Sequence, residues 1–183
     1  DVFAVGVSTF NGNVLVGSGI TLSPDGNAFH TGIVTATSVT GVGTVTSVTA
    51  SGIDLSGLLR EGVKITAGKL SDNTNIDLEN GMVHLFTTQE TTTSTPNIRF
   101  SSSVTLNDVM QIGESIAVTI ITTAASGGYS AQLTIDGAAV TENWVGGSAP
   151  SDGGSSGVDI HAYTIIKTAS ATFTVIGNQS KTS

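Results

Sequence analysis

The sequence predicts an all-β protein in two parts, and three observations carry this prediction. Thr is more frequent than the 23 Gly, whereas charged residues make up only 11% of the chain. Such β-branched composition favours strands over helices. Short apolar pieces closed by Gly, Asn-Gly or Pro-Asp-Gly fill the first part, and longer alternating segments fill the second. We expect an extended Gly/Thr/Val-rich β-repeat region over residues 1–57, a connector over 58–81 and an antiparallel, jelly-roll-like β-sandwich over 82–183.

The first part is predicted to be shaft-like, as its apolar pieces are too short to fold separately. Across residues 12–41 each piece has two to four residues, and no piece can bury its own apolar side. Such a segment becomes ordered when copies or neighbouring chains stack and share one core. Residues 37–41 and 46–50 form a weak repeat. A flexible Gly/Ser/Thr linker is the alternative, but the Val and Ile content is high for a solvated spacer.

Three short apolar segments separated by turns lead through the connector into the first strand of the sandwich. They cover residues 63–66, 75–78 and 82–86, with turn residues between them. The polar residues 87–97 then predict an exposed loop. One helical turn is predicted over residues 105–110, where Thr105 is suited to cap its first N–H groups.

Strand signals become stronger in the second half of the chain. Residues 116–120 and 129–135 both alternate apolar and small or polar side chains. Asp136-Gly137 is a hairpin signal that leads into residues 138–145. The pattern predicts a three-stranded antiparallel meander.

Two further strands are predicted after a Gly-rich loop over residues 146–157. The first covers residues 159–167 and places Ile160, Ala162, Thr164 and Ile166 on one face. The second covers residues 171–176 and directs Phe173 and Val175 inward.

Charge excludes several classes of partner. The net charge is −8, and the first 59 residues contain no Lys or Arg. A chain without a basic patch has little to neutralise phosphates, which argues against nucleic acid and against an anionic membrane surface. No apolar run reaches the ~20 residues that cross a bilayer, so no membrane insertion is expected. The chain begins at Asp1 rather than Met, which is typical of a fragment or a processed chain.

No catalytic, metal or cofactor constellation is predicted. His30, His84 and His161 are isolated and lack metal-ligand spacing. The Asp residues are scattered over turns, where local hydrogen bonding explains them. Nucleophile-elbow, phosphate-loop and dinucleotide motifs are missing from the sequence. We therefore expect a protein that is not an enzyme and needs neither a cofactor nor a metal.

One group of residues is a candidate recognition surface. Trp144 lies at the rim of the Gly-rich loop and is suited to stack on a sugar or anchor a partner, although a core or interface Trp is the more ordinary interpretation. Asp159, His161 and Tyr163 share one strand face and suit proton handling or sugar binding, although a solvated sheet face is the more ordinary interpretation. Asp152, in the loop itself, completes the candidate surface.

Several long segments resemble one family. Residues 17–26 (Gly-Ser-Gly-Ile-Thr-Leu-Ser-Pro-Asp-Gly) and 31–37 (Thr-Gly-Ile-Val-Thr-Ala-Thr) resemble repeats in fibre-like structural proteins of tailed phages, especially marine cyanophages. Residues 61–70 are similar to the connector of such proteins. Residues 120–129 and 133–137 are similar to their C-terminal domain. The resemblance implies a virion structural role in an appendage of the tail, baseplate or capsid.

These inferences together predict a non-enzymatic phage virion protein on the particle surface. We expect a homo-oligomer, specifically a trimer. Stacking of the copies would bury Val and Ile side chains, and each buried side chain would contribute ~1.5–3 kcal/mol of stabilising free energy. Its partners would be copies of itself, other virion proteins and a host surface glycan or receptor. The alternatives are a receptor- or glycan-binding tip of a fibre, or a capsid-decorating protein. A polysaccharide depolymerase would need clustered acids in a groove, which the sequence does not predict.

Overall fold

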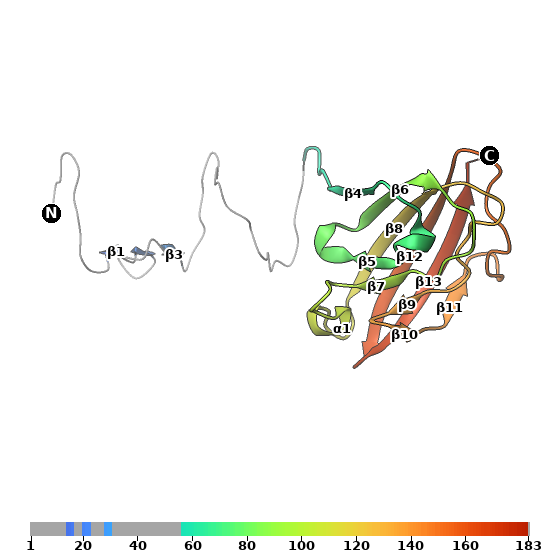
Figure 1. Ribbon diagram of the computed structural model, residues 1–183. Helices are drawn as coiled ribbons and strands as arrows, with labels where there is room; N and C mark the ends of the chain where they lie inside the picture. Colours follow the sequence, from blue (N-terminus) through green and yellow to red (C-terminus); the bar gives the residue numbers. More distant parts are fainter. Residues whose placement is uncertain (1–13, 17–19, 23–27, 31–55, 183) are drawn as a thin grey trace. The chain divides into compact units, whose positions relative to one another are not determined.

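The computed structural model describes residues 14–16, 20–22, 28–30 and 56–182 of a chain that divides into two units, Asp1–Asp54 and Leu55–Ser183 (Figure 1). The described residues of the first unit form three strands of three residues each: β1 (Val14–Val16), β2 (Ile20–Leu22) and β3 (Ala28–His30). They pair antiparallel in the order β1-β2-β3. The predicted repeat at residues 37–41 and 46–50 lies outside the described residues.

The second unit is built from two sheets, which makes the described protein all-β as predicted. The six-stranded sheet has the order β11-β13-β12-β8-β6-β4, and the four-stranded sheet has the order β10-β9-β7-β5. The strands of the larger sheet are β4 (Val63–Thr66), β6 (Val83–Gln89), β8 (Ser115–Thr123), β11 (Glu142–Trp144), β12 (Val158–Ala169) and β13 (Thr172–Lys181). Those of the smaller sheet are β5 (Asn75–Asp77), β7 (Asn97–Arg99), β9 (Thr134–Ile135) and β10 (Ala138–Ala139).

Strand pairing in this unit is mixed, so the predicted purely antiparallel arrangement is wrong. Antiparallel ladders join β8 to β12, β12 to β13 and β9 to β10. Parallel ladders join β4 to β6, β6 to β8, β5 to β7, β7 to β9 and β11 to β13. The predicted meander over residues 116–145 is also wrong, because β8 and β9 belong to different sheets. The chain between them crosses from one sheet to the other instead of turning back.

Several local predictions are confirmed. The β9–β10 hairpin turns at Asp136 and Gly137, whose φ angles of 52° and 80° are left-handed. The helical turn is α1 (Leu106–Val109), and the Thr105 side chain caps it by accepting a 3.1 Å hydrogen bond from the Asp108 N–H. Two 3-10 turns, η1 (Leu70–Asp72) and η2 (Leu78–Asn80), flank β5.

One strand was missed. Strand β7 begins at Asn97, the last residue of the segment that was predicted to be a polar loop, directly after Pro96. It has only three residues, too few for alternation to be a signal, and it is held by parallel ladders to β5 on one side and to β9 on the other. Both partners are remote in sequence, so no local signal marks this strand.

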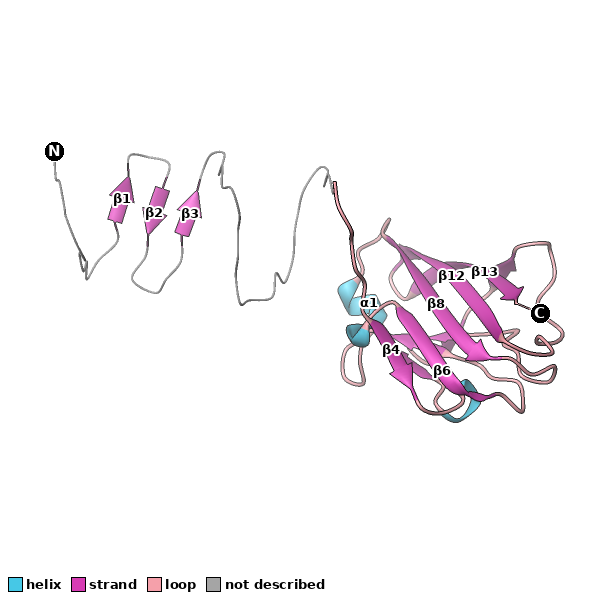
Figure 2. Cartoon of the chain, turned by 90° about the horizontal axis from the view of Figure 1, so that it is seen from above, coloured by secondary structure: helices cyan, strands magenta, loops and turns pink. Residues whose placement is uncertain are grey.

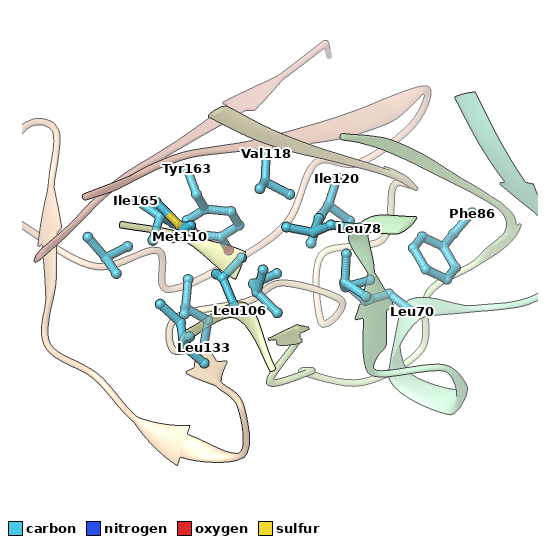
Figure 3. Packing of buried hydrophobic residues seen from close by; sticks show 14 residues of the cluster. Leu70, Leu78, Phe86, Leu106, Met110, Val118, Ile120, Leu133, Tyr163 and Ile165 are labelled. Atoms are coloured by element: carbon cyan, nitrogen blue, oxygen red, sulfur yellow. The ribbon is translucent and has the colours of Figure 1, made fainter. Parts of the chain in front are cut away.

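A single apolar cluster receives side chains from both sheets. Ile76 and Ile98 of the four-stranded sheet are fully buried, as are Ile120 and Ile165 of the six-stranded sheet. Figure 3 shows Leu70, Leu78, Leu106 and Leu133, which come from the short helices and loops, among the same buried side chains. Burial of this apolar surface is the main favourable term in folding, and it holds the two sheets together.

Candidate functional site

Three predicted site residues lie in the interior. Asp159, His161 and Tyr163 of β12 are 0%, 1% and 2% exposed, on the same side of the strand as the buried Ile165. The interpretation of this face as solvated is therefore wrong. The reason is the pleat of the strand, which turns every second side chain to the same face, here towards the core.

The inward row continues onto both neighbouring strands. The register places Thr122 of β8 opposite Asp159, and Gln179 of β13 opposite His161. Buried polar atoms without a hydrogen-bond partner occur throughout the row: Thr122 Oγ1, Asp159 Oδ1, both ring nitrogens of His161, Tyr163 Oη and Gln179 Nε2. General acid–base catalysis needs a hydrogen-bonded base and access to substrate. These polar atoms are buried, so this row gives no access to substrate.

Burial controls the protonation of the row. It lowers the pKa of His161 to about 4, although the charge of Asp159 acts to raise that pKa. Burial also raises the pKa of Tyr163, and the charge of Glu142 acts in the same direction. At neutral pH the imidazole and the phenol are both uncharged. The row therefore consists of neutral polar groups beside one carboxylate.

Asp159 anchors the Gly-rich loop that precedes β12. Its Oδ2 accepts a 2.8 Å hydrogen bond from the backbone N–H of Gly154. A Cβ atom on Gly153 would lie 2.2 Å from the Ala125 carbonyl oxygen and 2.8 Å from Asp159 Oδ2. Glycine is required here because the backbone passes close to its neighbours. The end of the loop is thus part of the packed structure.

Trp144 packs against the core, in agreement with its more ordinary interpretation. The half-buried indole meets the Tyr163 ring edge to face, with centroids 6.2 Å apart and planes at 69°. It lies over Gly177, where an added Cβ would be 2.9 Å from the indole. The aromatic pair spans β11 and β12 across the glycine of β13.

Asp152 has a different environment. Its carboxylate is exposed and forms an ion pair of 2.7 Å with Lys181 Nζ. The structure thus brings Trp144 and Tyr163 into contact, places Asp159 and His161 beside them on the interior face, and leaves Asp152 at the surface. The five predicted residues do not form one recognition surface.

Two buried charged residues were not predicted. The Glu90 carboxylate accepts hydrogen bonds from the backbone N–H groups of Leu70 and Ser71, at the start of η1. The Lys167 ammonium donates to the carbonyl oxygens of Asn107 and Met110 at the end of α1. Alternation groups Lys167 with Tyr163 and Ile165 on one face of β12 but does not show that this face is the buried one, and nothing local marks Glu90.

The charged groups that line one hollow of this unit are already engaged with other residues. This hollow, of about 350 Å³, is lined by Asn97, Arg99, Asp136, Gly137 and residues 101–105. The Arg99 guanidinium pairs with Asp77, and the Asp136 carboxylate accepts the N–H groups of Leu106 and Asn107. No aromatic ring lines this hollow, so it lacks a stacking platform.

Comparison with known proteins was made at three levels. Family models, curated proteins and solved structures all give no match. Within the described residues, no three His, Asp or Glu side chains gather to hold a metal ion. Among the described helices, none has the length and apolar character to cross a membrane.

Proposed function

We propose that this chain is a non-enzymatic structural protein of a phage virion, in a fibre-like appendage of the tail, baseplate or capsid. Residues 1–57 assemble copies of the chain, as a trimer, into a shaft. The resemblance of several long segments to fibre-like virion proteins supports this proposal. The structure adds one further support, which concerns the size of the strands in the first unit.

The short strands of the first unit carry the proposal. β1, β2 and β3 have three residues each and form a regular antiparallel ladder. Isolated small sheets are marginally stable in water, and strands usually have five or six residues. Three strands of this length gain stability by packing against further surface. In a stacked assembly, other copies of the same segment provide that surface.

The two sheets of the second unit fit a β-sandwich, which we include in the proposal. Their shared apolar cluster supports this assignment, because a sandwich buries the inner faces of two sheets against each other. The interior position of Asp159, His161 and Tyr163 supports a structural role of the unit. A recognition role for Trp144 gains no support, since its ring packs on Tyr163 and over Gly177.

Assembly through residues 1–57 is tested by the molar mass of the purified chain. Light scattering should give a mass near three times 18.4 kDa. Deletion of residues 2–57 should abolish that mass while the remaining unit keeps its strand signal. A folded monomer at all concentrations would contradict the shaft. Labelled antibody on intact particles would test the virion location separately.

A further inference from the structure

The outer face of the six-stranded sheet is more apolar than a solvent-facing surface needs to be. Cross-strand register aligns Ile65, Leu85, Ile121 and Ile160 in one row across β4, β6, β8 and β12. We call these four residues the outer row. Val63 and Val83 begin a second row beside it. All six side chains lie on the side opposite to the core.

This face also carries no ionisable side chain. The Lys, His and Asp residues of its strands occupy the alternate positions, as Lys64, His84 and Asp159 do, and face the other side. The other outward positions of β8, β12 and β13 hold uncharged side chains: Thr, Ser, Asn, Ala, Val and Ile. Yet the unit that begins at Leu55 holds all six basic and eleven of the fourteen acidic residues of the chain. Ionisable side chains are therefore absent from the outer face of the six-stranded sheet, although the unit contains many of them.

The size of the face matches a protein contact. Figure 2 shows β4, β6, β8, β12 and β13 side by side. β12 pairs with β8 over the nine residues 158–166 and with β13 over eight of them, and β6 and β4 continue the face over four positions each. With strands about 4.8 Å apart and a rise of about 3.3 Å per residue, this face spans roughly 540 Å². Stable interfaces bury about 800 Å² per partner, so this face supplies most of one.

We infer that the outer face of the six-stranded sheet binds the same face of a second copy of this chain. The absence of charge on this face indicates which partner binds it. Like surfaces meet in a contact between two copies, and an acidic protein repels itself wherever carboxylates meet carboxylates. An uncharged face avoids that repulsion. A charged partner would instead need opposite charges, and the face offers none. This contact goes beyond the proposed function, because it lies outside residues 1–57 and joins one trimer to another, so that the mass rises above that of a trimer as the concentration increases.

Lysine substitutions on the full-length chain test the inference. Ile65→Lys is suitable because Ile65 is 63% exposed, so the monomer loses little packing. Thr119→Lys is a second variant, since Thr119 is already polar and faces outward at the centre of the sheet. Ile112→Lys is the matched control, because Ile112 is 66% exposed and lies outside the sheet. Light scattering over a dilution series gives the association, and circular dichroism verifies the fold.

The expected result is weaker association in both face variants and no change in the control. An unpaired charge buried in a contact between like faces should raise the dissociation constant by about a hundredfold or more. Unchanged association in folded Ile65→Lys and Thr119→Lys chains would overturn the inference. If deletion of residues 2–57 then abolished that association, the proposed shaft would stand without this contact. The inference would also be overturned if the chain were monomeric and Thr119→Lys made residues 1–57 sensitive to protease. That result would mean that the N-terminal segment of the same chain covers the face.

Discussion

At the scale of single residues, Trp144 has a structural role that can be measured. Its ring packs edge to face on Tyr163 and covers Gly177, so truncation would remove a half-buried aromatic contact. We expect Trp144→Ala to lower the free energy of unfolding by about 2–4 kcal/mol, below the range for a fully buried Trp. Urea denaturation followed by circular dichroism measures the change. Trp144→Phe, which keeps a ring, should lose less, and equal stability of all three proteins would contradict the packing role.

His161 should make the fold sensitive to acid. Its pKa is about 4 in the folded protein and near 6.5 in the unfolded chain, so the unfolded chain binds a proton first as the pH falls. Stability is therefore full above pH 6.5 and declines as the pH falls to about 4. The shift corresponds to roughly 3 kcal/mol. Urea midpoints measured between pH 7 and pH 4 provide the test.

Replacement of the imidazole separates this effect from that of the carboxylates. In His161→Phe the pH dependence of stability between pH 6.5 and 4 should become shallower, because the titrating group is gone. A smaller slope of the same sign should remain, since burial also lowers the pKa of His84. At neutral pH the variant should be about as stable as the parent, because both ring nitrogens of His161 lack partners. An unchanged slope in His161→Phe would show that other groups govern the acid response.

The interior row also shows where residue patterns mislead. The two faces of β12 were separable by alternation, but the apolar side, with Ile160 and Ile166, was the natural candidate for the core. The core instead received Asp159, His161 and Tyr163. Alternation shows which residues share a face and leaves open which face is covered. The inferred contact between copies would cover the apolar face as well, and both faces of β12 would then be buried.

At the scale of elements, Asp136 connects the β9–β10 hairpin to helix α1. Its carboxylate oxygens accept hydrogen bonds of 2.7 and 3.0 Å from the backbone N–H groups of Leu106 and Asn107, which open the helix. We expect Asp136→Ala to lower the free energy of unfolding by about 2–4 kcal/mol, because it removes both charged hydrogen bonds and strains a left-handed residue. Asp136→Asn tolerates the left-handed backbone and should lose less. Thermal melts of the parent and the two variants measure these changes in stability. Identical losses in Asp136→Ala and Asp136→Asn would contradict the capping role.

Elements defined by local chemistry were the predictable ones. Asp136-Gly137 specifies its hairpin through left-handed φ angles, and Thr105 specifies the start of α1 through its capping oxygen. The parallel ladders that hold β7 join segments about twenty or more residues apart. Their partners are chosen by packing of the whole sheet, which no short window contains. The assignment of strands to each sheet could therefore not be predicted from the sequence, although most of the strands themselves could.

At the scale of the whole molecule, the boundary between the two units should be accessible to protease. Residues 56–62 are exposed and precede the first strand of the second unit, and Arg60 is the first Lys or Arg of the chain. We expect trypsin to cleave after Arg60 first and release residues 1–60 as a single piece. The fragment 61–183 keeps every strand from β4 onward and should retain the melting temperature of its unit in the intact chain. Mass spectrometry locates the cut, and Arg60→Gln is the control that should abolish it. Unfolding of the fragment after this cleavage would mean that residues 1–60 are required for stability, and the chain would then not fold as two independent units.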